Sequence, residues 1–427
     1  MSIFRQPEDK FARMTQTPIP TLVSTLAVPT IISMLITSLY NMADTFFVGQ
    51  IGTSATAAVG VALPLMAIIQ AIGFTFGQGS GNHISRLLGQ QQRKEAEHMA
   101  SVAFFSAFAL GAVLGVLGTL WLDPLVDLLG ATATSAGYTK DYARYILIGC
   151  PFMVSALVLN NQFRFQGNAV FGMVGIFSGA VVNIILDPIL IFALNMGVRG
   201  AATATVISQA VGAVWVLRFL TGSRTRLRLS VKNMPLVGKV IGPCLGLGVS
   251  TFVMIATESI LSISFNSSLA RYGGDIAVGA MTIITSATQL LSMPVQGLCQ
   301  GAQPIMSFNF GAGKGDRVKQ AFRLQFIICV AYAAAFWAAC MLVPQMFAGI
   351  FSTDPELVRY TAWAMRVYMA GIFSTGFQVS CQQSFVALGQ AKISLFMACL
   401  RKLILLIPLI FIPVSYTHLT LPTNSLV

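Results

Sequence analysis

Long apolar segments separated by short polar breaks run along almost the whole chain. Each segment approaches the roughly 20 apolar residues that an α-helix needs to cross a bilayer. The sequence does not show the alternation of apolar and polar residues, in segments of about ten, that indicates a transmembrane β-barrel. We therefore predict an all-α polytopic membrane protein. The predicted spans lie at residues 20–47, 55–82, 96–121, 139–162, 169–194, 199–220, 241–269, 276–306, 321–346, 359–386 and 393–413.

Polar segments divide these spans into two halves. We expect a cytoplasmic N-terminal segment at residues 1–18, an N-lobe of helices one to six at 19–220 and a cytoplasmic linker at 221–239. A C-lobe of helices seven to eleven follows at 240–413. The polar, Thr-rich residues 414–427 break the apolar pattern where a twelfth span would lie. We expect this stretch to be a non-native tail and the twelfth helix to be missing.

The two halves repeat one another at a constant offset. The corresponding pairs are Gly79 and Gly301, Ser85 and Ser307, Gly89 and Gly311, Arg144 and Arg366, and Gly167 and Gly389. Six spans per half give both copies the same orientation in the membrane. We therefore predict two pseudo-symmetric six-helix lobes, related by an axis along the membrane normal, that face one another across a cleft.

Composition and charge support the membrane assignment. Charged residues make up 9% of the sequence, whereas soluble domains carry about 25%. The net charge of +12 would also suit a nucleic-acid partner, but most of the 26 Lys and Arg residues lie in alternate loops. That distribution follows the positive-inside rule and predicts a cytoplasmic N-terminus. We expect no nucleic-acid partner.

Several kinds of enzyme are disfavoured by the sequence. The seven cysteines are isolated and form no CxxC pair, which indicates neither disulfides nor a metal site. Residues 311–316 lack the GxxxxGK[ST] pattern of an ATP site. The histidines His83, His98 and His418 fall in loops or in the tail, so a histidine-dependent intramembrane hydrolase is disfavoured. We expect a protein that is not an enzyme and that uses no cofactor.

The first span carries one carboxylate at the end of a polar stripe. Pro29, Ser33, Thr37, Tyr40 and Asp44 follow one another at helical spacing and share one face, while the other faces are mostly Ile, Leu and Met. An ionisable side chain in lipid costs several kcal/mol, so such an acid indicates a functional site that faces a wet cavity. The alternative is that Asp44 is a solvated residue at a helix end.

A second acid, Asp187, lies in the fifth span. It shares a helix face with Asn183 and with three glycines, and Pro188 follows directly. Proline removes a backbone hydrogen bond and can bend the helix, which frees a carbonyl near the carboxylate. The alternative is a structural acid that is hydrogen-bonded to Asn183 or Ser178.

A third acid, Glu258, continues a polar stripe in the seventh span. Asn266 on the same stripe corresponds to Asp44 under the repeat, so the second lobe keeps a polar group there but not the acid. Glu258 is either part of the ion site or without a functional role. Buried acids lose their charge by binding a proton, Na⁺ or a cationic substrate, and this mutual exclusion is what antiport requires.

Glutamines lie close to one face of the eighth span. Gln289 and Gln296 belong to this series, which either lines a cavity or bridges helices through hydrogen bonds. Together with Thr37 and Tyr40 they form our prediction of a substrate-cavity wall. Methionine and phenylalanine on such a wall would suit a promiscuous apolar pocket.

Motifs spread over about residues 15–413 resemble the bacterial branch of the multidrug and toxic compound extrusion family. The motifs are NMADTFFVGQIG, GNHISRLLGQ, NIILDPILIF, GGDIAVGAMTI and PVQGLCQGAQPIMSFNFGAG. The resemblance implies two six-helix lobes, alternating access, and export of cationic amphiphilic drugs across the cytoplasmic membrane in exchange for H⁺ or Na⁺. We also expect a monomer surrounded by membrane lipids.

The resemblance also implies roles for individual residues. Asp44, Asn183 and Asp187 match functional positions and would hold the proton or Na⁺. Asn160 or Asn161 matches a polar position near that site, and Glu258 resembles an acid of the sodium-coupled branch. The second-lobe acid of that branch has no counterpart in the tenth span.

A neighbouring class, the flippases that move lipid-linked saccharide precursors, is the alternative function. Such a flippase would need a cleft lined by Arg and Lys to hold pyrophosphate, and the predicted spans contain few basic residues.

Overall fold

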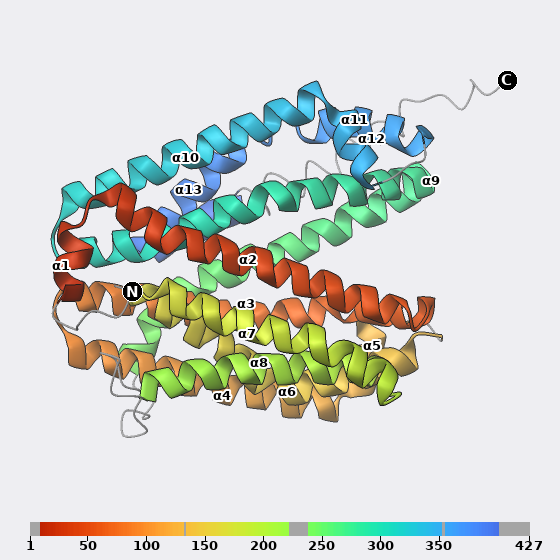
Figure 1. Cartoon of the computed structure of the whole chain (residues 1–427), viewed down its shortest axis with the longest axis horizontal. Helices are drawn as coiled ribbons and strands as arrows, with labels where there is room; N and C mark the ends of the chain where they lie inside the picture. Colours follow the sequence, from red (N-terminus) through yellow and green to blue (C-terminus); the bar gives the residue numbers. More distant parts are fainter. Residues whose placement is uncertain (1–8, 132–133, 222–237, 352–354, 401–427) are drawn as a thin grey trace.

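The computed structural model describes residues 9–131, 134–221, 238–351 and 355–400, and these residues form helices joined by short turns (Figure 1). The prediction of an all-α protein is confirmed. The helices are α1 (Asp9–Gln16), α2 (Ile19–Gly49), α3 (Thr53–Gly89), α4 (Arg93–Leu120), α5 (Leu122–Leu128), α6 (Ala136–Phe165), α7 (Ala169–Pro188), the π-helix η1 (Ile189–Ala193), α8 (Val198–Thr221), α9 (Gly238–Gly311), α10 (Gly315–Leu342), α11 (Pro344–Phe351), α12 (Pro355–Tyr368), α13 (Ser374–Ala387) and α14 (Ala391–Cys399).

Seven helices of the described part are long and apolar enough to cross a bilayer. They are α2, α3, α4, α6, α7 together with η1, α8 and α10. Their backbone polar groups are bonded within each helix, which is what the hydrocarbon core of a membrane demands. The predicted span at 359–386 is wrong as a single helix. A turn that contains Gly371 separates α12 from α13 there.

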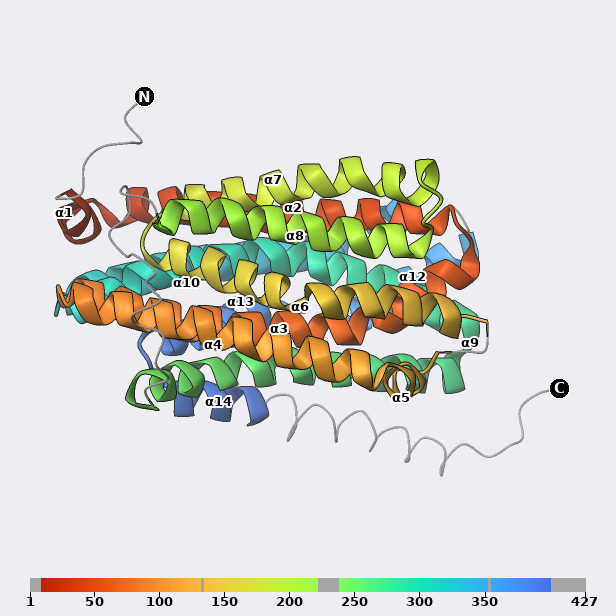
Figure 2. The same cartoon turned by 90° about the horizontal axis from the view of Figure 1, so that it is seen from below.

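Two predicted spans, 241–269 and 276–306, fall within the single helical element α9. Cys244 Sγ lies 3.7 Å from the carbonyl oxygen of Phe76, while Pro304 accepts a hydrogen bond from Ser85 at 3.0 Å. Both contacts are to the same part of α3, so α9 doubles back and forms two antiparallel limbs. The reversal is visible at the right-hand end of Figure 1, and Figure 2 shows α14 beside the first limb.

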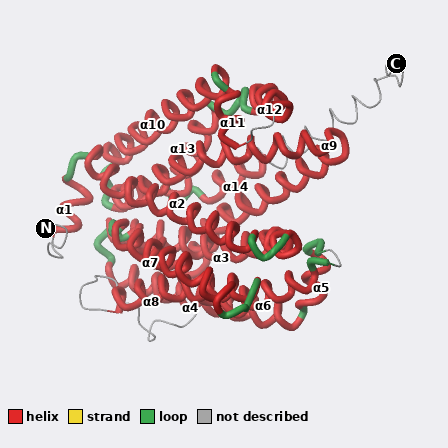
Figure 3. The backbone as a smooth tube through the Cα atoms, turned by 45° about the vertical axis from the view of Figure 1, so that its right-hand side comes forward, coloured by secondary structure: helices red, strands yellow, loops and turns green. Residues whose placement is uncertain are grey.

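The helices form two groups. One holds α3 to α8, the other holds α10 to α14, and α2 runs between them (Figures 1 and 3). The groups converge at the end of the bundle where α1 lies, and they spread apart toward the opposite end. This layout agrees with two lobes. The predicted tail at 414–427 and residues 222–237 of the predicted linker lie outside the described residues.

The lobes are interleaved at the end where they converge. The first part of α2, with Leu22 and Leu26, packs in one apolar core with Val295 and Cys299 of the second limb of α9. Conversely, Cys244 at the start of α9 belongs to the core formed by α3, α4 and α6. Each lobe therefore inserts the beginning of its first helix into the core of the other lobe.

Candidate substrate cavity and ion site

A cavity of about 840 Å³ lies between α2, α3, α6, α7, α8 and the second limb of α9. The six residues predicted from sequence to line a substrate cavity all lie on its wall. They are Thr37, Tyr40, Asn160, Asn161, Gln289 and Gln296. The volume suits a drug-sized molecule, since ligand pockets commonly measure roughly 300–1,000 Å³.

The glycine face of α7 provides much of this space. Gly172, Gly175 and Gly179 line the cavity at successive helical turns. Because these positions carry no side chain, the wall recedes there. Asn160 faces this recess, and its Oδ1 lies 3.6 Å from where a Cβ of Gly175 would stand. Among the described residues, none donates a hydrogen bond to that buried oxygen.

Asp187 and Asn183 lie on the same face of α7, beyond the glycines, and both are fully buried. Asn183 Nδ2 donates to Asp187 Oδ1 at 3.3 Å, whereas the Ser178 hydroxyl donates to the carbonyl oxygen of Gly175. Of the two partners considered for Asp187, Asn183 is therefore the one the structure shows. Asp187 is not one of the residues that line the cavity, whose α7 wall ends at Gly179 and Ala180.

Asp44 is buried on α2, with an exposed fraction of 9%, so it is not a solvated residue at a helix end. It lies close enough to Asp187 for the two carboxyl groups to interact electrostatically. Like Asp187, it stands behind the cavity wall. Neither carboxylate lines the cavity, although neighbouring residues of both helices, such as Asn41, Thr45 and Ala180, do. The helices that carry the two acids, α2 and α7, pack against each other within the first lobe.

Three buried oxygens at this site have no donor among the described residues. They are Asp44 Oδ1, Asp187 Oδ2 and Asn183 Oδ1. Buried polar atoms are nearly always paired, so each orphan needs an explanation. Carboxylate and amide oxygens suit a proton or a hard monovalent cation, and the three atoms fit the predicted ion site. The exchange of ions at this site stays a prediction.

Two tyrosines lie near the acids, and one of them also lines the cavity. Tyr40 lies on the cavity wall, accepts a hydrogen bond from Gln209 at 3.3 Å and lies within electrostatic reach of Asp44. Tyr142, on α6, is buried and lies within the same reach of both Asp44 and Asp187. The sequence pattern did not single out Tyr142, since it is one aromatic residue in an apolar helix.

Arg164 is a second residue that the sequence analysis missed, because it stands at the end of a span among loop cations. It is the one charged residue on the cavity wall in the described part of the chain. Its Nη1 donates to Gln300 on α9 at 2.5 Å and its Nη2 donates to Asn161 at 2.6 Å. Arg164 therefore joins the two lobes at one end of the cavity.

Glu258 lies in α9, but its side chain is outside the described part, so its predicted role stays a prediction.

The MatE family model matches two segments of the chain, residues 29–189 and 251–412. Together they cover more than half of the sequence. The chain belongs to the MatE family. The second match begins at the same offset from the first that relates Gly79 to Gly301, which supports the internal repeat. Members of this family are membrane transporters, so this MatE chain is a multi-pass transporter of the cell membrane.

Curated MatE relatives cover most of the chain. The chain is 29% identical over 400 residues to the multidrug export protein MepA of Staphylococcus haemolyticus. The matched region covers 92% of this chain and 87% of the relative. The chain is 27% identical over 387 residues to MepA of Staphylococcus aureus, with 90% and 85% covered. The family indicated by the sequence motifs is confirmed.

Solved structures share the MatE fold. A MOP superfamily transporter from Pyrococcus furiosus superposes with a TM-score of 0.89 at 24% identity, over 98% of this chain and 93% of its own. An outward-facing multidrug resistance MATE family transporter gives the same score at 24% identity, over 96% and 92%. At these identities the likeness establishes the fold.

Proposed function

We propose that this MatE chain exports cationic amphiphilic drugs from bacteria by antiport against H⁺ or Na⁺, through alternating access of the cavity to the two sides of the membrane. The observation that carries this proposal is the pair of buried carboxylates, Asp44 and Asp187, with unpartnered oxygens behind a cavity of drug size. The printed names of the staphylococcal relatives, multidrug export proteins, agree with it.

Coupling follows from the cost of buried charge. Ionised carboxylates in a low-dielectric interior are unfavourable unless something neutralises them. A proton or Na⁺ on Asp44 and Asp187 does so directly, with Asn183 holding one carboxylate oxygen. A cationic drug in the cavity does so across Tyr40, which separates the cavity from Asp44. Because ion and drug neutralise the same negative charge, they compete, and release of one accompanies binding of the other.

We also propose an orientation in the membrane and an oligomeric state. The N-terminus faces the cytoplasm, following the charge bias, and the exposed apolar side chains Val113, Val116 and Leu120 on α4 contact lipid. The transporter works as a monomer and uses H⁺ or Na⁺ rather than a cofactor.

Ethidium efflux from vesicles, with a proton gradient and a sodium gradient imposed separately, tests the function and identifies the ion. We expect efflux with one gradient and its loss in the double variant Asp44→Asn with Asp187→Asn. The matched control is Asp127→Asn, since Asp127 is an exposed acid of α5. Undiminished efflux by the double variant would refute the role of the carboxylates.

Export of lipid-linked saccharide precursors is the less favoured function. It would require several basic residues on the cavity wall to hold pyrophosphate. The described wall carries Arg164 alone, and both of its Nη atoms are engaged by Asn161 and Gln300.

A further inference from the structure

Residues that correspond under the repeat meet face to face between α3 and the second limb of α9. The Ser85 hydroxyl donates to the carbonyl oxygen of Pro304 at 3.0 Å. The Ser307 hydroxyl lies 2.8 Å from Oδ1 of Asn82 and also 2.8 Å from the carbonyl oxygen of Ala387, so its one proton is shared between an acceptor across the seam and one in its own lobe. Ser85 corresponds to Ser307 and Asn82 corresponds to Pro304, so the two contacts are exchanged by the pseudo-two-fold relation between the lobes.

The glycines of the same motifs make a second reciprocal pair of contacts. A Cβ placed on Gly89 would lie 2.1 Å from the carbonyl oxygen of Phe308. A Cβ placed on Gly311 would lie 2.2 Å from the carbonyl oxygen of Arg86. Phe308 corresponds to Arg86 under the repeat, just as Gly311 corresponds to Gly89. Both obstacles are backbone atoms, so no side-chain rotation would make room.

We propose that Ser85, Gly89, Ser307 and Gly311, here named the glycine clasp, control which end of the transporter is shut. The clasp holds the lobes together at the end that carries α1, and a side chain at either glycine favours the conformation that is open at this end. A substitution that clashes in one of two conformations shifts the population toward the other. This inference rests on the alternating access proposed above.

The chemistry of the clasp suits a contact that must open. When the lobes part, a serine hydroxyl can exchange its carbonyl or amide acceptor for water. Each of these hydrogen bonds therefore contributes only modestly to the free energy that holds the lobes together. Glycine contacts bury no side chain, so parting them exposes little apolar surface. An apolar core that includes Leu22, Leu26, Val295 and Cys299 also crosses between the lobes at this end. Within the clasp itself, the fit is between backbone atoms, and one methyl group would disturb it.

The native Cys244 is a reporter for this state. It is fully buried against α3, and its backbone carbonyl lies 2.1 Å from where a Cβ of Gly79 would stand. The first limb of α9 belongs to the second lobe by sequence, so opening the clasp end draws Cys244 away from α3. The background for the experiment replaces the other cysteines with alanine, at Cys150, Cys299, Cys329, Cys340, Cys381 and Cys399.

The experiment measures alkylation of Cys244 by N-ethylmaleimide in membranes. We expect Gly89→Ala and Gly311→Ala each to raise the rate by about tenfold. The matched controls are Gly60→Ala on α3 and Gly246→Ala on α9, because a Cβ at either position meets no atom within 4 Å. Their rates should equal that of the parent.

A second pair of variants guards against misfolding. Ser85→Ala and Ser307→Ala remove the hydroxyl donors without adding bulk, and together they should raise alkylation in the same direction by about threefold. Faster alkylation in folded glycine and serine variants, judged by an unchanged thermal transition, supports the clasp. Rates equal to the parent in both sets overturn it. The readout needs no transported compound, so its failure and a failure of drug antiport are separate results.

Discussion

The two lobes contribute differently to the cavity and to the contact between α3 and the second limb of α9, here called the seam. At the seam, the two lobes use corresponding positions, and the contacts of Ser85 and Gly89 are mirrored by those of Ser307 and Gly311. In the cavity the contributions differ. The two acids that are buried in the described part of the chain lie in the first lobe, whereas the second limb of α9 supplies uncharged glutamines such as Gln296.

The difference shows what a repeated fold does and does not duplicate. The clasp contacts involve backbone atoms, and two copies of one fold place their backbones alike. The proposed ion site depends on particular side chains, and a repeat does not have to keep those. The described residues are therefore alike in the clasp and unlike around the cavity.

The largest expected effect tests whether the chemistry lies in one lobe. Asp187→Asn should lower ion-driven efflux at least about 100-fold, because an amide cannot exchange a proton. Gln296→Ala, in the other half of the cavity, should lower efflux only about fivefold, since it removes at most neutral hydrogen bonds. Initial rates of ethidium efflux from vesicles measure both. Similar losses for the two variants would mean that both lobes share the chemistry.

Arg164 tests how much the hydrogen bonds at one end of the cavity, one of which joins the two lobes, stabilise the fold. Arg164→Ala removes two charge-assisted hydrogen bonds, of which the one to Gln300 crosses between lobes. We expect the folded state to lose roughly 3 kcal/mol, measured by thermal unfolding in detergent. Arg164→Lys should recover only part of it, because an ammonium group lacks the planar fork of a guanidinium. A melting temperature unchanged in Arg164→Ala would contradict this role.

Tyr40 tests the connection between the cavity and the acids. Tyr40→Phe removes the hydroxyl that accepts from Gln209 and that separates the cavity from Asp44. We expect a loss of about 1 kcal/mol in drug affinity, or roughly fivefold in the dissociation constant, with the fold intact. Fluorescence titration with ethidium measures it. Unchanged affinity would show that the hydroxyl takes no part in binding.

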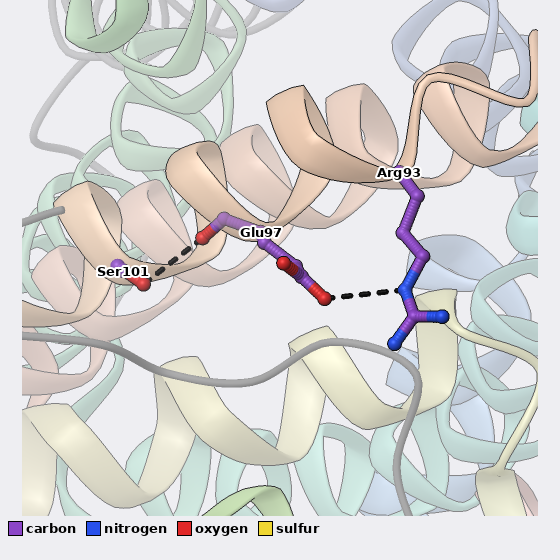
Figure 4. A network of polar contacts seen from close by, with 3 residues as sticks. All are labelled: Arg93, Glu97 and Ser101. Carbon is purple, nitrogen blue, oxygen red and sulfur yellow. Dashed lines mark hydrogen bonds and ion pairs between the residues drawn. The ribbon is translucent and has the colours of Figure 1, made fainter.

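The smallest effect is expected at the surface of α4. Arg93 pairs with Glu97 at 3.2 Å, and the backbone carbonyl of Glu97 accepts from Ser101 (Figure 4). The side chain of Arg93 is 55% exposed. Arg93→Ala should change stability by no more than about 0.5 kcal/mol, since exposed pairs one helical turn apart contribute little. A larger change in thermal unfolding would mean that this pair takes part in lobe packing.

Helical periodicity predicted much of the site. The stripe that contains Thr37 and Tyr40 reaches the cavity wall, and the α7 face with Asn183 and Asp187 is buried as its spacing indicated. Periodicity shows which residues share a face, but not which helix will cover that face. For this reason it did not show that Asp44 is buried where α2 packs against α7.

Other features depend on contacts between distant segments. The repeat of Gly89 at Gly311 was visible in the sequence, but not that each glycine touches the other copy. Arg164 looked like a loop cation because its partner Gln300 is remote in sequence. The turn between α12 and α13 was missed because one glycine, Gly371, does not distinguish a bent span from a straight one.

The π-helix that follows Asp187 has a mechanical consequence. Residues Ile189–Ala193 form one wide turn, so this part of the fifth span holds more residues per turn than the α-helix before it. If the wide turn moved along the helix, the residues between its old and new positions would rotate by about 100°, while the residues on either side would keep their orientation. Asp187 lies on the last turn of regular α-helix before it, so a shift of the wide turn toward the start of α7 would turn this carboxylate to another face.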